Sequence, residues 1–414
     1  MPRLLVHYHF FHPDDVVSAR MFSDLAVEQR RRGWEVTALT SNRSWRDPRA
    51  RLPRSESWEG VAIERVFRPP WSQARALQRL GNSAFMLGAA PWRLRALGRF
   101  DAIVVGSDPS FAALVGPAFR RLDPGAALVH WCFDVYPEAI LAEGAIPAAA
   151  ALAPVARRLM GAAYRRYDAL VDIGPRMQER LAAYDSGARQ ETLVPWALTE
   201  AERPVAVDAA TRAALYPRAK LALLYSGTMG KAHDFEPFLA LARACRARAG
   251  DAVALCFAVR GNRSDELRAA VRPDDTNVTL APFAEETALP ARLAAADVHL
   301  VSLRPDWAGV VVPSKFFASL AIGRPVIYAG PAESEIARWI AAHDLGLHLT
   351  PDTVDTVAER LVRLVGDPAA LARWRENALA VYRRQWSKQV TNDRWDALLR
   401  ELCAARAGSR HLHP

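Results

Sequence analysis

Short apolar runs and amphipathic stretches alternate along this chain and are separated by polar loops. Residues 4–9 form an apolar run that predicts a strand, residues 18–33 have the spacing of a helix that Gly33 ends, and residues 34–40 predict the next strand. A strand, a loop, a helix and a second strand in this order are typical of the start of a doubly wound α/β domain.

The same alternation continues in two halves, and a chain of 414 residues is expected to divide into two domains. Residues 1–195 are predicted to be the first domain and residues 218–385 the second. Between them, residues 196–217 are rich in Ala, Glu, Arg and Pro without a clear period, which predicts a linker. The other apolar runs that predict strands lie at residues 61–66, 101–106, 127–133, 169–173, 191–195, 221–226, 252–259, 277–280, 298–302 and 325–328.

Residues 309–330 predict a loop, a short helix, a tight turn and a buried strand. Pro313 suits a helix's first turn, and Gly323 suits a left-handed residue at its end. A helix that opens at Ser314 would present backbone N–H groups beside the ammonium of Lys315, which suits a phosphate or diphosphate. An ordinary helical connection between two strands fits the local sequence equally well.

Residues 227–234 predict a glycine loop that leads into a helix. The loop lacks the spacing of a P-loop, but Gly227 and Gly230 allow the backbone to approach an anion closely, and Lys231 follows directly. The chain has only four lysines, and Lys231 and Lys315 occupy the two loops that suit an anion. This coincidence favours an anion site.

Two groups of polar residues follow strands of the first half. His130 and Asp134 come at the end of one predicted strand, where they suit catalysis or acceptor binding, although Asp134 could equally cap a helix. His7, His9 and His12 lie at the end of the first strand, but no carboxylate or cysteine pattern completes a metal site. Their position still matters, because open α/β sheets bind ligands at the carboxyl ends of their strands.

Residues 69–100 mix aromatic and aliphatic residues with arginines. This composition suits a helix at an anionic membrane surface, and an amphipathic helical pair that covers the sheet explains it equally well. The net charge of +9 favours anionic partners, but no nucleic-acid motif is present, so nucleic acid is not expected. Four widely spaced cysteines, no leader sequence and no long apolar window together predict a cytoplasmic protein, and a membrane contact through residues 69–100 would place it at the inner face of the membrane.

Four stretches together resemble the GT-B glycosyltransferases, in particular the bacterial surface-polysaccharide branch of retaining glycosyltransferase family 4. They span nearly the whole chain in the expected order, and the last is the most diagnostic. The first is the opening strand (residues 4–9) with residues 19–20 and 31–40, and the others are residues 134–138, 225–234 and 313–326.

The resemblance implies two Rossmann-like α/β domains that face each other across a cleft, with a final helix (residues 386–406) packing back on the N-terminal domain. The donor, a nucleotide diphosphate sugar, would bind the C-terminal domain without a metal or another cofactor, and the acceptor the N-terminal domain. Asp134 and His130 would serve catalysis. Acceptor-binding residues would be His9, Ser18 and Arg20. Donor-binding residues would be Gly227, Thr228, Lys231, Arg260, Pro313, Ser314, Lys315 and Glu335.

The chain departs from the family at two glutamates that usually contact the donor sugar and the ribose. Alignment on Gly323 places Val310 and Ala318 there, and neither side chain accepts a hydrogen bond. Either Glu333, Glu335 or Asp306 substitutes, or donor binding is unusual, or transfer activity is lost.

The sequence therefore predicts a glycosyltransferase that passes a sugar with retention to a saccharide or lipid-linked acceptor in cell-envelope biosynthesis. Two alternatives are a non-catalytic nucleotide-sugar-binding scaffold and an enzyme that glycosylates a small natural product.

Overall fold

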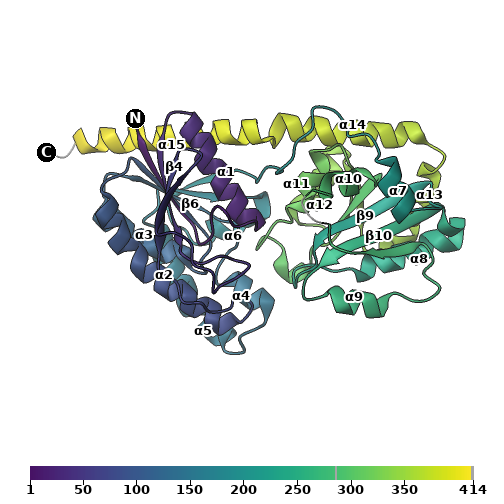
Figure 1. Cartoon of the computed structure of the whole chain (residues 1–414), viewed down its shortest axis with the longest axis horizontal. Helices are drawn as coiled ribbons and strands as arrows, with labels where there is room; N and C mark the ends of the chain where they lie inside the picture. The colour runs from purple at the N-terminus through teal and green to yellow at the C-terminus, as the bar shows by residue number, and fades with distance from the viewer. Residues whose placement is uncertain (285–286, 412–414) are drawn as a thin grey trace. The chain divides into compact units, whose positions relative to one another are not determined.

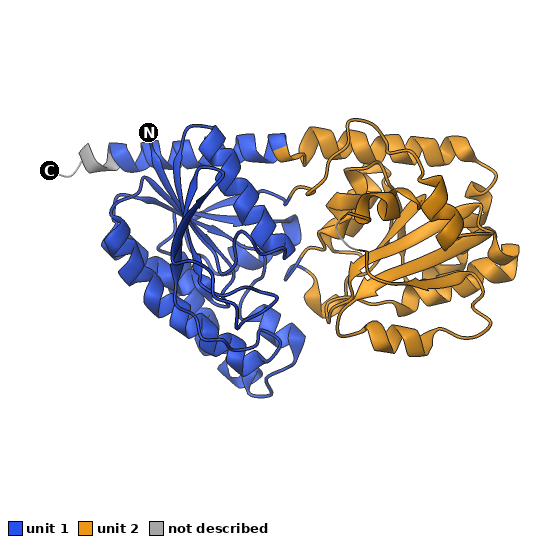
Figure 2. Cartoon of the chain, in the orientation of Figure 1, with its two compact units in different colours: residues 1–195, 309–311, 389–414 blue, residues 196–308, 312–388 orange. Residues whose placement is uncertain are grey.

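The computed structural model describes residues 1–284 and 287–411, which divide into two compact units (Figure 2). Unit 1 comprises Met1–Pro195, Gly309–Val311 and Gln389–Pro414, and unit 2 comprises Trp196–Ala308 and Val312–Lys388. The segment expected to be a linker is counted with unit 2 and is partly helical. Its helix α7 (Ala209–Leu215) forms because the carboxylate of Asp208 accepts a hydrogen bond from the Thr211 N–H at 2.7 Å.

Unit 1 is built on a sheet that, within the described residues, has eight strands in the order β3-β4-β2-β1-β5-β6-β7-β8. All neighbouring strands are parallel except β3, which runs antiparallel to β4 at one edge. The strands β5, β6 and β7 are buried along their whole length, as expected where helices cover both faces of a sheet. The strands are β1 (Arg3–His7), β2 (Glu35–Ser41), β3 (Ser55–Trp58), β4 (Val61–Val66), β5 (Ala102–Gly106), β6 (Ala127–Trp131), β7 (Ala169–Asp172) and β8 (Arg189–Thr192).

Two groups of helices cover this sheet (Figure 1). In the first group, α2, α3 and α5 contact one another or the short helix η1. In the second group, α1 contacts α15 near the end of the chain, where the Gln29 side-chain amide donates to the Asn392 carbonyl oxygen at 3.5 Å. The helices are α1 (Val17–Arg31), α2 (Ala76–Leu97), η1 (Ala112–Val115), α3 (Gly116–Leu122), α4 (Glu138–Glu143), α5 (Ala149–Tyr164), α6 (Pro175–Ala182) and α15 (Lys388–His411).

Helix α15 completes unit 1 although it comes from the far end of the chain. Trp395 is fully buried, with its ring 5.0 Å from that of Trp131, and Asp396 accepts a hydrogen bond from the Trp34 indole at 2.8 Å. The described helix continues to His411, beyond the predicted end at residue 406.

Unit 2 has its own parallel sheet, with six strands among the described residues in the order β11-β10-β9-β12-β13-β14. Its strands are β9 (Leu221–Thr228), β10 (Val253–Arg260), β11 (Val278–Ala281), β12 (Val298–Ser302), β13 (Val326–Ala329) and β14 (Gly346–Leu349). Its other helices are α8 (Glu236–Ala249), η2 (Gly250–Ala252), α9 (Ser264–Ala270), α10 (Leu289–Ala294), η3 (Pro305–Trp307), α11 (Lys315–Leu320), α12 (Glu335–His343), η4 (Pro351–Thr353), α13 (Val354–Leu364) and α14 (Pro368–Gln385).

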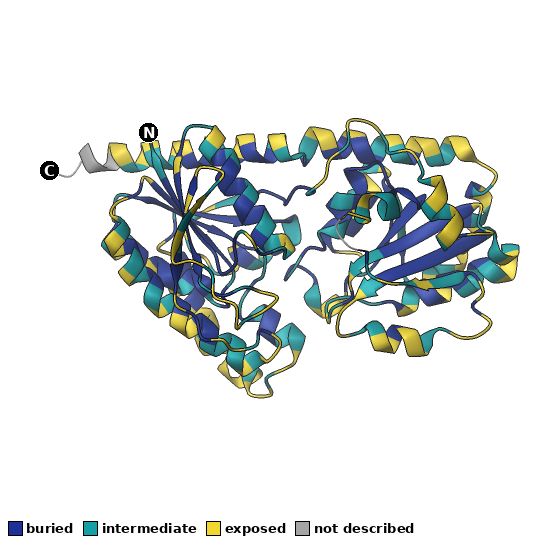
Figure 3. Cartoon of the chain, in the orientation of Figure 1, coloured by how far each residue is buried: buried dark blue, intermediate teal, exposed yellow. Residues whose placement is uncertain are grey.

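The core of unit 2 lies on both faces of its sheet, and Figure 3 shows buried strands between partly exposed helices. The turn after α11 is the one expected from sequence, because Gly323 adopts a φ of 70° and confirms the predicted left-handed residue. The predicted α/β class with parallel sheets is likewise confirmed.

In both units the order of the strands reverses next to the first strand. This switch point lies between β1 and β5 in unit 1 and between β9 and β12 in unit 2. Loops that leave neighbouring strands at a switch point diverge, and ligands of open α/β sheets bind in the crevice between them. His9 follows β1 in unit 1, and Gly227 and Thr228 end β9 in unit 2, so these predicted residues lie next to the switch points.

Candidate functional site

Lys315, the first residue of α11, reaches the carboxyl edge of the unit 2 sheet. Its ammonium donates to the Thr228 carbonyl oxygen at 3.0 Å and lies 3.3 Å from Nε2 of His233. Burial lowers the pKa of Lys315 to about 8, so the side chain is still mostly charged at neutral pH. An ammonium has three N–H donors, and these two contacts account for two of them.

His233 fixes the position of this ammonium. Its Nδ1 lies 2.8 Å from the Ser302 carbonyl oxygen, which can only accept, so Nδ1 carries the proton and Nε2 presents a lone pair to Lys315. Burial, followed by the charge of Lys315, lowers the pKa of His233 to about 3 and keeps the ring neutral. The Ser302 hydroxyl accepts from the Asp234 N–H at 3.0 Å, which ties the same loop to β12.

Gly227 leaves the space that the Lys315 side chain occupies. The residue has a φ of 125°, and a Cβ atom placed there would lie 2.7 Å from Cε of Lys315. Any other residue would therefore strain the backbone and displace the lysine. The sequence suggested that this glycine lets the backbone approach an anion, and in the structure the space beside it holds the Lys315 side chain.

The other predicted donor residues of the two strand-end loops lie at the same edge of the sheet. Thr228 pairs with Arg260 in the register of β9 and β10, and the Arg260 guanidinium stacks on the ring of Phe283 at 4.1 Å. Lys231 is exposed in the loop after β9. The structure thus brings Gly227, Thr228 and Arg260 together with Lys315.

The helix start predicted at Ser314 is less regular than the sequence suggested. Helix α11 has only six residues, and the Ser314 side chain makes no capping hydrogen bond. Pro313 is buried directly before it. Lys315 therefore contributes its side-chain contacts, rather than a long helix dipole, to this edge.

Four further positions bear on the missing family glutamates. Glu335 is buried at the start of α12, while Glu333 is exposed. Val310 is buried and counted with unit 1, where its carbonyl oxygen accepts a hydrogen bond from the Val135 N–H at 3.3 Å. Ala318 is half-buried in α11.

In unit 1, Asp134 lies in the loop after β6. The Ser107 hydroxyl oxygen accepts from the Asp134 N–H at 3.1 Å and so holds this loop against the end of β5. Burial, together with the charge of the neighbouring Asp108, raises the pKa of Asp134 to about 7, and Arg79 opposes both effects. A carboxyl group that titrates near neutral pH can accept or return a proton, which is the property a general base requires.

A buried polar cluster lies at the switch point beside Asp134. His9 Nδ1 is 3.0 Å from an Asp108 carboxylate oxygen, and the buried Arg68 guanidinium lies 5.4 Å from the ring centre of Phe10. Within the described residues, His9 Nε2 and both Nε and Nη1 of Arg68 have no hydrogen-bond partner. Unpartnered buried polar atoms of this kind are costly and favour a ligand or water contact.

The remaining predicted residues of unit 1 are placed differently. His130 is buried between Tyr164 and Tyr167, where Nδ1 donates to the Val105 carbonyl oxygen at 2.9 Å and burial lowers the pKa to about 4. These contacts are those of a core histidine, and the structure does not bring it to Asp134. Ser18 and Arg20 are half-buried in the first turn of α1.

His7, His9 and His12 do not converge on one point. His7 donates to the Leu39 carbonyl oxygen at 2.9 Å, whereas His12 stacks on the ring of Trp58 at 4.2 Å. Across residues 1–284 and 287–411, no group of three or more His, Cys, Asp or Glu side chains gathers in a way that could hold a metal ion.

Sequence reasoning missed His233, Asp108 and Arg68 as members of these two clusters. The first two carried a signal, since His233 lies in the glycine loop and Asp108 directly follows a buried strand. Arg68 carried none that distinguishes it from the many other arginines, because only the fold shows that it is buried.

Comparison with known proteins gives consistent results for both units. Residues 18–197 match the model of the glycosyl transferase 4-like domain. The probable glycosyltransferase WbjE of Pseudomonas aeruginosa is 26% identical over 312 residues, which is 73% of this chain and 75% of WbjE.

Solved structures share the fold over nearly the whole chain. WaaG, a glycosyltransferase involved in lipopolysaccharide biosynthesis, has a TM-score of 0.62 at 15% identity and covers 95% of this chain and 99% of its own. HepE of Anabaena, solved in complex with UDP, has a TM-score of 0.63 at 13% identity and covers 97% of this chain and 100% of its own.

The two parallel sheets and their strand-end clusters define a protein of the GT-B fold class. The chain is a nucleotide-sugar glycosyltransferase, and its residues 18–197 match the glycosyl transferase 4-like domain. The expected GT-B fold and glycosyltransferase activity are thereby confirmed.

Proposed function

We propose that this enzyme transfers a sugar, with retention, from a nucleotide diphosphate sugar bound at Lys315 to a saccharide or lipid-linked acceptor of the cell envelope. The observation that carries the donor site is the ammonium of Lys315, which the Thr228 carbonyl oxygen and His233 hold in place while one of its three N–H donors remains available. A diphosphate is the part of the donor that such a cation would bind most strongly. HepE, which shares this fold, was solved with UDP.

Transfer would then depend on two groups. Lys315 would stabilise the charge that develops on the leaving diphosphate, so the reaction would proceed without a metal ion or another cofactor. Asp134, with its raised pKa, would orient the acceptor hydroxyl. Retention of configuration would follow if the acceptor attacks from the side that the diphosphate leaves, with the diphosphate taking the proton.

The acceptor is proposed to bind unit 1 at the cluster of His9, Asp108 and Arg68. The unpartnered N–H groups of Arg68 can donate hydrogen bonds to the hydroxyl oxygens of a saccharide. Ser18 and Arg20, in the first turn of α1, would extend this site.

A membrane contact through residues 69–100 would bring the enzyme to lipid-linked acceptors at the inner face of the membrane. Helix α2 exposes Leu77, Phe85 and Trp92, which fall on one side of the helix. Arg75 and Arg95 are exposed at its two ends, where they suit anionic headgroups. Within the described residues, no helix has the length and hydropathy required to cross a bilayer.

The experiment that tests the proposed function is a donor assay on the full chain. UDP-sugars are screened for UDP release with and without saccharide acceptors, and the anomeric configuration of each product is read by NMR. The variant Lys315→Met should lose UDP release, whereas Lys220→Met, at the opposite end of β9, should keep it. If both variants keep UDP release, Lys315 does not bind the donor.

A further inference from the structure

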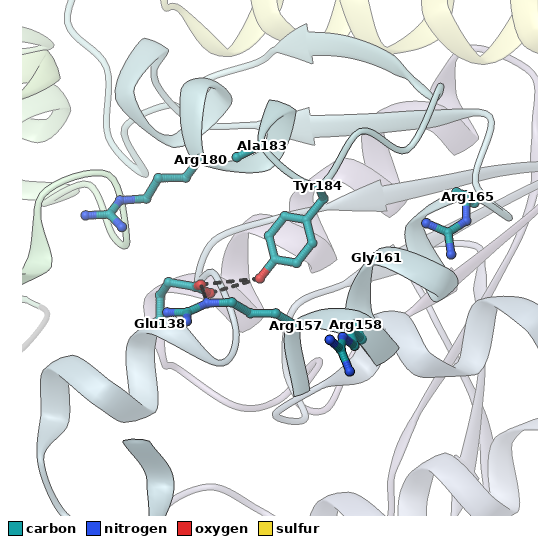
Figure 4. Close-up of a pocket in the computed structure, with 8 residues that line it drawn as sticks. All are labelled: Glu138, Arg157, Arg158, Gly161, Arg165, Arg180, Ala183 and Tyr184. Atoms are coloured by element: carbon teal, nitrogen blue, oxygen red, sulfur yellow. Dashed lines mark hydrogen bonds and ion pairs between the residues drawn. The ribbon is translucent and has the colours of Figure 1, made fainter. Parts of the chain in front are cut away.

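Unit 1 contains a second polar site, distinct from the one that holds Asp134. A pocket of about 640 Å³ opens between α4, α5 and α6. Four of its residues are arginines and one is an acid (Figure 4). It is lined by Glu138, Arg157, Arg158, Gly161, Arg165, Arg180, Ala183 and Tyr184.

Glu138, the one acidic residue that lines this pocket, already has hydrogen-bond partners. Arg157 Nε donates to a Glu138 carboxylate oxygen at 2.9 Å, and the Tyr184 hydroxyl lies 3.1 Å from the other oxygen (Figure 4). The same hydroxyl is 3.2 Å from the Tyr136 carbonyl oxygen. Glu138 and Arg157 therefore compensate each other and leave the pocket with excess positive charge.

Two of the arginines have exposed side chains and no acidic neighbour. Arg158 and Arg165 are seven positions apart on or just after α5, so they lie on the same side of it. In residues 1–284 and 287–411, neither side chain has a hydrogen bond or an ion pair. Their guanidinium groups can meet an anion without breaking any existing contact.

The neighbouring side of α5 is apolar and exposed. Leu152, Val155 and Leu159 follow the three- and four-residue spacing of one helix face, and each has more than half of its surface exposed, at 62%, 55% and 54%. Val155 is three positions before Arg158, so the apolar stripe borders the arginine side of the helix. A ligand that fits both sides has an anionic group and an apolar chain.

We propose that the pocket between α4, α5 and α6 binds the phosphate headgroup of an anionic lipid, whose apolar part lies along Leu152, Val155 and Leu159. A phosphate accepts several hydrogen bonds at once, and the planar fork of arginine matches it better than a point charge would. The proposal extends the membrane contact proposed above, and a soluble diphosphate tests the pocket without a membrane.

The soluble test measures inorganic pyrophosphate binding by calorimetry. All proteins carry Lys315→Met, so pyrophosphate at the proposed donor site does not contribute. Adding Arg158→Gln and Arg165→Gln should weaken binding by roughly tenfold or more, because two charge-assisted contacts are lost. The matched control adds Arg51→Gln and Arg54→Gln, which remove the same charge before β3 at the opposite edge of the sheet, and should bind like the reference.

The membrane test distinguishes a lipid headgroup from free phosphate. The wild-type chain should bind phosphatidylcholine vesicles with phosphatidic acid more tightly than vesicles of equal surface charge made with phosphatidylglycerol. Arg158→Gln with Arg165→Gln should abolish this preference, and the Arg51 and Arg54 control should retain it. Pyrophosphate affinity unchanged by the pocket variant, an equal loss in the control, or no preference for phosphatidic acid in the wild type would overturn the proposal.

Discussion

Lys315 and Asp134 show how burial tunes two residues of opposite charge toward neutral pH. Burial disfavours the charged form of each, so the pKa of Lys315 falls to about 8 and that of Asp134 rises to about 7. Each group therefore changes charge near the pH at which the enzyme would operate. That behaviour is common at functional sites and uncommon at exposed positions.

The lysine gives a prediction about nucleotide binding. UDP affinity should fall as the pH rises through about 8, because Lys315 loses the proton that binds the diphosphate. The terminal phosphate titrates near pH 6 and is already fully charged in that range, so it does not mask the effect. Calorimetry at several pH values checks this, and Lys315→Met should show a flat profile. A flat profile in the wild type would contradict the proposed contact.

The carboxyl group gives a prediction about stability. Because the folded-state pKa of Asp134 is raised, the folded protein keeps a proton that the unfolded chain releases, and the free energy of unfolding falls between about pH 4 and about pH 7. The Asp134→Asn variant has no carboxyl group to titrate, so its free energy of unfolding should not fall in this way. We expect it to stabilise unit 1 by roughly 2 kcal/mol at pH 8 while lowering transfer activity. Urea unfolding at pH 4 and pH 8 measures the difference, and equal stability of the two proteins at pH 8 would be the contrary result.

Residue-scale prediction from sequence was limited by contacts between distant positions. Lys315 and Asp134 were singled out because a scarce residue type and a strand-end position are visible in sequence. His233 is 82 positions from Lys315, and no local pattern joins them. His130 was singled out by the same strand-end argument, yet the direction of its side chain, which only the fold determines, takes it into the core.

At the scale of elements, α2 is a single helix that covers the sheet, where the sequence suggested a helical pair, and its membrane contact stays a prediction. Met86, Ala90 and Leu94 are buried against unit 1, while Leu77 and Trp92 on another side are exposed. The helix therefore covers the sheet and also presents an apolar surface. Composition alone could not distinguish the covering face from the exposed face. Arginines occur throughout the segment, and only the structure shows which of them form ion pairs.

Those partners decide how the membrane contact is tested. Arg79 is paired with Glu143 and Arg93 with Glu64, so changing either would break an ion pair inside unit 1. Arg75 and Arg95 are exposed instead.

Arg75→Gln with Arg95→Gln should reduce binding to phosphatidylglycerol vesicles at low salt by roughly 1 kcal/mol per charge. Flotation of the vesicles with bound protein measures this. The matched variant is Arg79→Gln with Arg93→Gln. It should lower the unfolding temperature, because two ion pairs are lost, and should change vesicle binding little. If the two double variants bind vesicles equally well, α2 is a covering helix only.

At the scale of the molecule, residues from the end of the chain complete the unit that its beginning forms. The sequence predicted the α/β class, because buried parallel strands appear as continuous apolar runs. It could not show that the Trp395 ring packs against Trp131, which lies 5.0 Å away in space and far away in sequence.

This packing predicts a large stability effect. Trp395→Ala should destabilise unit 1 by about 3–5 kcal/mol, since it removes a fully buried aromatic side chain and leaves a cavity. Calorimetry should show that unit 1 of the variant unfolds at a lower temperature than in the wild type. Below that unfolding temperature the UDP affinity, which depends on unit 2, should be retained. Unfolding that is unchanged by the substitution would mean that α15 does not stabilise unit 1.

The central claim, that Lys315 holds the donor diphosphate, is tested most directly by comparing UDP with UMP on the wild type and on Lys315→Met. The account predicts that the wild type prefers UDP by at least about tenfold, or 1.4 kcal/mol, and that the variant loses most of this preference. Equal affinity of the wild type for both nucleotides, or a preference for UDP that survives in Lys315→Met, would contradict it.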